Sequence, residues 1–254
     1  SAAFSSWRDE DPPVRQQQGL PNSTIRWIAV QLGSATQERL RVTADLIVVA
    51  YFYLLRICEY TQSLRPTRTV PLRRQDIQLW NQGAIIAHTA PLADLLRATG
   101  ATINLENQKN GKKGGVVHHA ASGDPGLDPI PALARLVHRI AHLPATTPLG
   151  TFELEPTRLQ RVSPGDITSA VRLGAVGDNL ADAGYSLDRI GSHSLRSGGA
   201  INLALNGYDQ VVIMKMGRWS SNTFLTYIQS QLGELTQGIS TSMARPMRFH
   251  RVGT

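Results

Sequence analysis

The sequence has little cysteine, no long apolar run and a minority of acidic residues. Cys58 is the one cysteine among 254 residues, which excludes an internal disulfide framework and a metal site built on cysteines. No run reaches the roughly 18 apolar residues that a membrane-spanning helix needs. The N-terminus shows no basic region followed by an apolar stretch, the pattern of a secretory signal. We therefore expect an intracellular protein that is not associated with a membrane.

The charge balance favours a polyanionic partner. Lys and Arg number 26 against 19 Asp and Glu, which gives a formal net charge of +7. A basic face attracts phosphate groups and releases counterions from nucleic acid. The hydrophobic content of 41% is enough to bury the core of one or two domains.

The spacing of apolar residues predicts an α+β fold, mostly helical with one small antiparallel sheet. Helices are expected over residues 24–31, 43–55, 131–142, 163–183, 194–205, 209–216 and 221–231. Arg56, Glu59 and Tyr60 are expected to continue the second of these helices. Strands are expected at 76–80, 84–88, 101–106 and 116–119, joined by turns at 81–83 and 108–114. Residues 1–22 are polar and are interpreted as an N-terminal arm or linker.

The segment Gly191-Ser192-His193-Ser194-Leu195-Arg196 holds the most informative motif. A helix that begins near Ser194 places His193 and Arg196 in its first turn, where free N–H groups and the helix dipole favour an anion. A histidine donor and an arginine fork at that position can grip a phosphate. The alternative is a capping serine beside an ordinary surface arginine.

Two further segments carry candidate residues. Downstream, Gly217-Arg218-Trp219 precedes Tyr227, whose phenol can attack phosphorus if nearby cations help to remove its proton. Upstream, Arg56 ends an apolar segment, and Glu59 three positions later is a partner that can orient its guanidinium. Taken singly, the aromatic residues are expected in the core and the Arg–Glu pair on the surface.

The ordered set resembles the tyrosine recombinase (phage integrase) family. An Arg in an LLRxxE segment, a Lys on a β-hairpin, HxxR, and then a Trp and a Tyr appear in the family's order, with about 170 residues from Arg56 to Tyr227. The resemblance covers residues 24–235. The GRWSS variant is similar to recombinases of DIRS- and Crypton-like eukaryotic mobile elements. Such a family implies double-stranded DNA as partner, a homo-tetramer on DNA, no metal or other cofactor, and a nuclear location in a eukaryote.

The resemblance implies a role for each residue. Tyr227 would attack the scissile phosphate, form a 3′-phosphotyrosine and release a 5′-hydroxyl. Arg56 and Arg196 would neutralise the non-bridging oxygens, and His193 would donate to the same phosphate. Trp219 occupies the position where many relatives carry His, and its N–H could bond an oxygen.

The three lysines of the second hairpin, together with Arg218 and Glu59, complete the set of candidate site residues. Lys109 is the expected general acid for the leaving 5′-oxygen, with Lys112 and then Lys113 as alternatives. Lys112, Lys113 and Arg218 are expected to contact DNA, and Glu59 to support Arg56. Histidines at 118 and 119, and at 138 and 142, suggest a metal, but no acid or cysteine accompanies them, so none is expected.

The sequence departs from the family in two ways. Eight positions separate Trp219 from Tyr227, one fewer than is common in bacterial relatives, and we expect residues 1–254 not to include the N-terminal core-binding domain that is usual in the family. We expect a catalytic domain over residues 23–235 and a tail over 236–254 that docks on a neighbouring protomer. The alternatives are a type IB topoisomerase-like enzyme and a domesticated, non-catalytic DNA-binding module.

Overall fold

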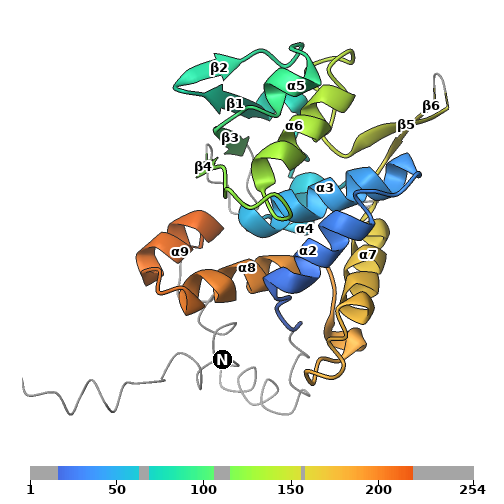
Figure 1. Cartoon of the computed structure of the whole chain (residues 1–254), viewed down its shortest axis with the longest axis vertical. Coiled ribbons are helices and arrows are strands. Elements are labelled where there is room, and N and C mark those ends of the chain that lie inside the picture. Colours follow the sequence, from blue (N-terminus) through green and yellow to red (C-terminus); the bar gives the residue numbers. More distant parts are fainter. Residues whose placement is uncertain (1–16, 63–68, 106–114, 156–157, 220–254) are drawn as a thin grey trace, which may run out of the picture.

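The computed structural model describes residues 17–62, 69–105, 115–155 and 158–219. Figure 1 shows a small sheet with helices beside it at one end of the molecule and a larger group of helices at the other. The helices are α2 (Asn22–Gln31), α3 (Glu38–Phe52), α4 (Ile57–Tyr60), α5 (Leu92–Leu95), α6 (Pro129–Arg139), α7 (Pro164–Gly177), α8 (His193–Leu205) and α9 (Gln210–Gly217). Short 3-10 turns lie at Arg74–Asp76 and Leu187–Arg189.

The expected hairpins form one four-stranded antiparallel sheet. Its order is β2-β1-β3-β4, with β1 at Ile77–Asn81, β2 at Ala84–Ile86, β3 at Gly100–Leu105 and β4 at Gly115–Ala120. In the register, Leu79 pairs with Ile86 on one side and with Ala101 on the other. A separate two-stranded ribbon, β5 (Thr151–Glu155) with β6 (Arg158–Arg161), was not predicted and projects from the body in Figure 1.

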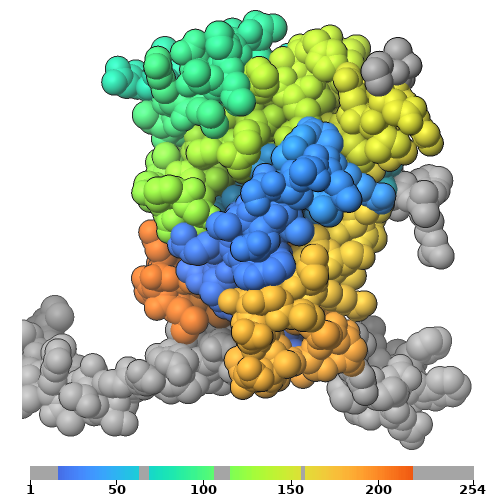
Figure 2. Space-filling model, turned by 45° about the vertical axis from the view of Figure 1, so that its right-hand side comes forward, coloured from blue at the N-terminus to red at the C-terminus, as the bar shows by residue number. Residues whose placement is uncertain are grey.

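Helix α3 lies at the centre of the fold. Its residues from Val42 to Tyr51 are all buried, and it contacts α2, α6, α7, α8 and β5. The buried carboxylate of Asp45 joins it to α6, since Arg135 donates to Asp45 Oδ1 at 2.6 Å. Figure 2 shows α2 and the start of α3 in blue across the face, between the green sheet end and the yellow-to-orange α7 region.

Local signals in the sequence were accurate for two helices. Leu133, Leu136 and Val137 of α6, with Ile140 at its C-cap, form the predicted apolar stripe, and all four are buried. Helix α7 opens with the predicted N-cap, because Ser163 Oγ accepts from the N–H of Asp166 at 3.2 Å. It ends at Gly177, earlier than the expected position 183.

The last residues of the expected arm belong to the folded body. Leu20 is buried, and its N–H donates to the Ser194 carbonyl at 3.0 Å. The side chain of Gln17 accepts from the N–H of His193 at 3.0 Å. Residues 17–21 are therefore a packed strap on α8, whereas residues 1–16 lie outside the described part. Among the described residues, no helix is both long and apolar enough to cross a membrane.

Candidate active site

The expected continuation of α3 through Arg56 is wrong. The helix ends at Phe52, and Leu54 has a φ of 48°, in the left-handed region. The N–H of Leu55 donates to Ala50 at 2.9 Å and the N–H of Leu54 to Tyr51 at 3.4 Å, the pattern of a Schellman motif. Arg56 therefore lies in extended backbone ahead of a new short helix, α4.

A second helix ends in the same way beside the first. Arg218, after α9, has a φ of 55°, and the N–H of Trp219 donates to Met214 at 3.0 Å. Gly207 and Asn179, residue types that tolerate this conformation, take the equivalent positions after α8 and α7. Leu54 and Arg218 each pay about 1–2 kcal/mol for a left-handed backbone. Such strain persists only where surrounding contacts fix it.

Glu59 holds Arg56 in place. The backbone N–H of Arg56 donates to Glu59 Oε2 at 2.8 Å, and its Nη1 donates to Oε1 at 3.0 Å. The Glu59 side chain is 2% exposed and that of Arg56 is 21% exposed. Glu59 therefore contacts Arg56, as its spacing in the sequence suggested. Its carboxylate caps the start of α4 instead of forming an ion pair within a continued α3.

Two adjacent glycines let α8 approach this corner. A Cβ on Gly198 would lie 2.1 Å from the Leu20 carbonyl oxygen, and a Cβ on Gly199 would lie 2.6 Å from that of Tyr51. Both distances are too short for any larger residue. Gly199 thus lets α8, whose first turn carries His193 and Arg196, pack against the end of α3, and Gly198 lets the strap at Leu20 pack against the same helix.

Arg196 is buried in the corner. It is 1% exposed, and its guanidinium donates to the carbonyls of Leu54 and Gly217. The same guanidinium lies 4.3 Å from the ring centroid of Trp219, a cation–π contact. Arg196 therefore joins the ends of α3 and α9 and contacts the predicted tryptophan.

His193 lies at the surface of the same corner. Its side chain is exposed, and its pKa is lowered, first by partial desolvation and then by the positive charges of Arg196 and Arg56. His193 and Arg196 share the first turn of α8, and Arg196 donates to the carbonyl of Leu54, two positions before Arg56. The three basic residues therefore lie at one corner of the fold.

Arg218 does not take the predicted place on the DNA-binding surface. Its side chain is 7% exposed, and Nη2 donates to Glu59 Oε2 at 2.8 Å. Burial lowers its pKa, while the charge of Glu59 acts in the opposite direction. The expected phosphate contact is corrected to an internal ion pair, because Arg218 lies at a turn that points its guanidinium inward.

Lys109, Lys112, Lys113 and Tyr227 lie outside the described residues. Of the predicted catalytic set, the structure thus places Arg56, His193, Arg196 and Trp219, and it brings them together. The sequence suggested His119 on β4 only as a possible metal ligand, which was set aside, and did not predict its contact with the end of α3. Its Nε2 lies 2.9 Å from the Phe52 carbonyl and its ring centroid 4.6 Å from that of Tyr53, so it ties the sheet to the end of α3.

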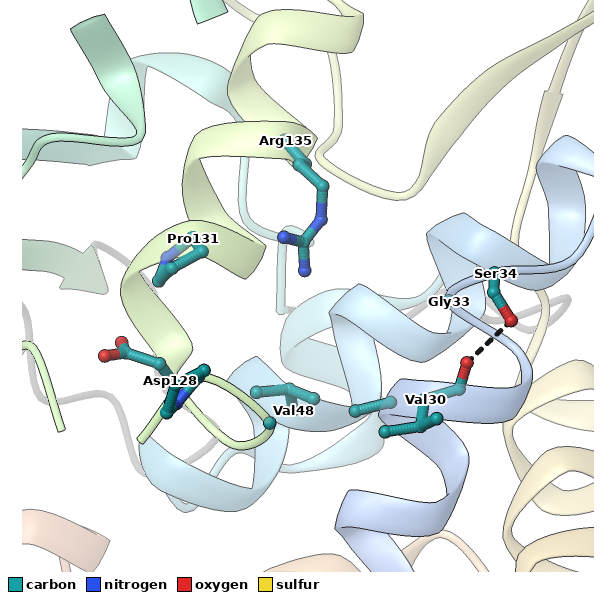
Figure 3. Close-up of a pocket in the computed structure, with 10 residues that line it drawn as sticks. Val30, Gly33, Ser34, Val48, Asp128, Pro131 and Arg135 are labelled. Carbon is teal, nitrogen blue, oxygen red and sulfur yellow. Dashed lines mark hydrogen bonds between the residues drawn. The ribbon is translucent and has the colours of Figure 1, made fainter. Parts of the chain in front are cut away.

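A groove of about 350 Å³ lies between α2, α3 and α6. Figure 3 shows Val30 and Val48 on one side and Arg135 and Pro131 on the other. Its charged groups have structural bonds: Arg135 binds Asp45, and Asp128 caps α6 by accepting from Ile130 at 2.8 Å. The groove contains none of the predicted site residues, so we do not assign it the chemistry.

Comparisons with known proteins identify the fold. No protein-family model and no curated protein matches the sequence. Among solved structures, XerH site-specific recombinase bound to palindromic difH substrate, a post-cleavage complex, matches with a TM-score of 0.57 and 17% identity, over 89% of this chain and 54% of that one. The pre-cleavage XerH complex matches with a TM-score of 0.55 and 17% identity, over 87% and 53%.

XerA recombinase matches with a TM-score of 0.50 and 16% identity, over 94% of this chain and 67% of that one. The chain thus spans about half the length of the XerH chains. With its helical body, its small antiparallel sheet and these matches, the chain has the fold of the tyrosine recombinase catalytic domain.

Proposed function

We propose that this chain is the catalytic part of a site-specific DNA recombinase that cuts and rejoins strands through a 3′-phosphotyrosyl intermediate. The observation that carries the proposal is the convergence of Arg56, His193 and Arg196 at one corner of this fold. The solved structures with that fold include XerH site-specific recombinase bound to its difH substrate, and this kinship in fold, with the net charge of +7, supports DNA as the partner here.

Two arginines suit the negative charge that develops on the phosphoryl oxygens. In the proposed step, the phenolic oxygen of Tyr227 attacks the scissile phosphorus and the bond to the 5′-oxygen breaks. Arg56 and Arg196 balance the negative charge on the non-bridging oxygens, and His193 donates a hydrogen bond to one of them. A 5′-hydroxyl then attacks the phosphotyrosine, which restores the phosphodiester and frees the tyrosine.

The leaving 5′-oxygen needs a proton. We assign that role to Lys109, with Lys112 as the alternative, and we assign backbone phosphate contacts to Lys112 and Lys113. The phenolic proton of Tyr227 passes to His193, whose lowered pKa favours the neutral form that can accept a proton.

The burial of Arg196 sets the order of contacts in this proposal. An incoming phosphate meets Arg56 and His193 first, since Arg56 is partly exposed and His193 is exposed. Arg196 lies behind them and stabilises charge from a site with low water content, where each charge interaction is stronger.

The assembly is also a proposal. We expect a homo-tetramer on double-stranded DNA, with the tail of residues 236–254 docked on a neighbouring protomer. Kinship with DIRS- and Crypton-like elements, and a nuclear location, stay predictions.

The decisive experiment is capture of the covalent intermediate. The full chain is incubated with a library of nicked duplexes whose central segment is randomised, and complexes that resist denaturant are recovered, released with protease and sequenced. A recovered, enriched sequence that is lost with Tyr227→Phe supports the proposal. DNA binding without any covalent complex would contradict it and favour a non-catalytic module.

A second assay separates the recombinase from a type IB topoisomerase. Two duplexes that carry the enriched sequence are mixed, and strand exchange between them is followed together with relaxation of a supercoiled plasmid. Exchange within an assembly of four protomers supports recombination. Relaxation by a monomer, with no exchange, would favour the topoisomerase.

A further inference from the structure

Arg218 occupies a position where its residue type is unfavourable. It is the left-handed residue after α9, with a φ of 55°, a conformation that glycine adopts at no steric cost. Its Nε is also buried without a hydrogen-bond partner. An arginine kept at such a cost must make contacts that a glycine cannot make.

Those contacts all lead to the segment that carries Arg56. The guanidinium of Arg218 donates to the Tyr53 carbonyl at 3.1 Å, to the Leu54 carbonyl at 3.2 Å and to Glu59 Oε2 at 2.8 Å. It therefore binds both the helix break ahead of Arg56 and the carboxylate that orients Arg56.

The side chains of Arg56 and Arg218 share the carboxylate of Glu59, with one oxygen for each guanidinium. With Arg218 on Oε2, Glu59 meets the Arg56 side chain through Oε1 and Nη1 alone. Among the described residues, the other nitrogens of the Arg56 guanidinium make no hydrogen bond. Without Arg218, Oε2 would be held by the backbone N–H of Arg56 alone, at 2.8 Å. The carboxylate could then give up that bond and turn to bind the Arg56 guanidinium through both oxygens, the preferred geometry of such pairs.

We propose that Arg218 is a positioning residue for Arg56: it occupies Glu59 so that Arg56 keeps donors available for the scissile phosphate. This role rests on the proposed function and differs from a DNA contact, because the guanidinium of Arg218 is buried. It also accounts for the presence of an arginine, instead of a glycine, at the left-handed position directly before Trp219.

The test compares Arg218→Met with the wild type on the nicked duplex recovered by covalent capture. The rate of covalent complex formation at saturating DNA is expected to fall about 10- to 100-fold, the size of effect typical of a group that orients a functional residue. DNA affinity and its salt dependence are expected to stay unchanged. Lys215→Met is the matched control, because it removes a charge from the exposed side of the same helix end and keeps the wild-type rate.

Two further variants separate positioning from a loss of folding. Arg218→Gly relieves the backbone strain and should be slow like Arg218→Met. Adding Glu59→Gln to Arg218→Met should recover part of the rate, since a neutral amide no longer draws Arg56 into an ion pair. A slow Arg218→Met that Glu59→Gln leaves slow or makes slower would overturn the proposal, and so would a weaker salt dependence of DNA binding, the mark of a lost phosphate contact.

A readout without DNA keeps this inference distinct from the proposed function. A crystal structure of Arg218→Met should show both Glu59 oxygens on the Arg56 guanidinium. An unchanged Glu59 contradicts the positioning role, even if the wild type proves to be a recombinase. Absence of a covalent complex with the wild type contradicts the proposed function instead.

Discussion

Leu54 and Arg218 are the left-handed residues that follow α3 and α9, and the carbonyl of Leu54 accepts a hydrogen bond of 3.2 Å from the guanidinium of Arg218. Arg196 donates to the same carbonyl. The two strained helix ends are thus held together by hydrogen bonds from the guanidinium groups of Arg196 and Arg218. The basic site is built on this junction, so we expect changes there to alter the positions of Arg56 and Arg196.

Tyr227→Phe is expected to abolish the covalent complex while DNA affinity is kept, because only the attacking oxygen is lost. The measurement is a denaturing gel of the protein with the nicked duplex. Tyr208→Phe is the matched control, since Tyr208 is 55% exposed and lies between α8 and α9. A covalent band with Tyr227→Phe would show that another residue is the nucleophile.

Arg56→Lys is expected to slow formation of the covalent complex by about 10²- to 10³-fold, the usual loss for one well-placed donor. Lysine keeps the charge but lacks the fork that can bind Glu59 and phosphate together. Single-turnover rates measure the effect. Arg97→Lys serves as control, because the Arg97 side chain is 74% exposed. Equal rates for Arg56→Lys and the wild type would remove Arg56 from the catalytic set.

Acid should destabilise the fold through its partly buried histidines. Burial is the main cause that lowers the pKa of both His88 and His119 below the ordinary value of about 6.5. The unfolded chain therefore binds more protons just below that pH, so the free energy of unfolding falls as the pH decreases. Each histidine contributes at most about 1.4 kcal/mol per pH unit.

Urea unfolding above and below about pH 6.5 tests this expectation. His119→Gln should reduce the pH dependence, because glutamine can still donate to the Phe52 carbonyl but does not titrate. If His119→Gln leaves the slope unchanged, His119 does not contribute to the acid sensitivity.

Gly199→Ala is expected to destabilise the protein by about 1–3 kcal/mol, the usual cost of overpacking. The new methyl group would lie 2.5 Å from Leu54 Cδ2 and 2.6 Å from the Tyr51 carbonyl oxygen, so α8 must move away from the helix break. Thermal unfolding measures the loss. Gly165→Ala in α7 is the control, with its nearest neighbour at 3.5 Å. Equal stability of the two variants would contradict the close approach of α8 and α3.

Features set by neighbouring residues were predictable from the sequence. Ser163 and Asp166 mark the start of α7. Helix α8 begins at His193, next to the start near Ser194 that the HxxR segment indicated. The strands around 81–83 follow from a local turn signal. In each case the deciding contacts lie within a few positions in the chain.

The break at Leu54 was not predictable in this way. The apolar run continues through it, and no glycine or asparagine marks a helix end. Glu59, three positions after Arg56, matched a helical ion pair, although the same spacing also fits a carboxylate at the third position of a new helix. Only contacts with α8 and α9 decide between the two, as they do for the inward orientation of Arg218.

The junction between Leu54, Arg196 and Arg218 also has a consequence for biosynthesis. Its bonds join residues 142 and 164 positions apart, so loop closure makes them late events in folding. A growing chain completes α3 and much of the sheet long before α9 leaves the ribosome. Until then the Leu54 carbonyl lacks both of its guanidinium donors, and the backbone ahead of Arg56 lacks the contacts that fix it.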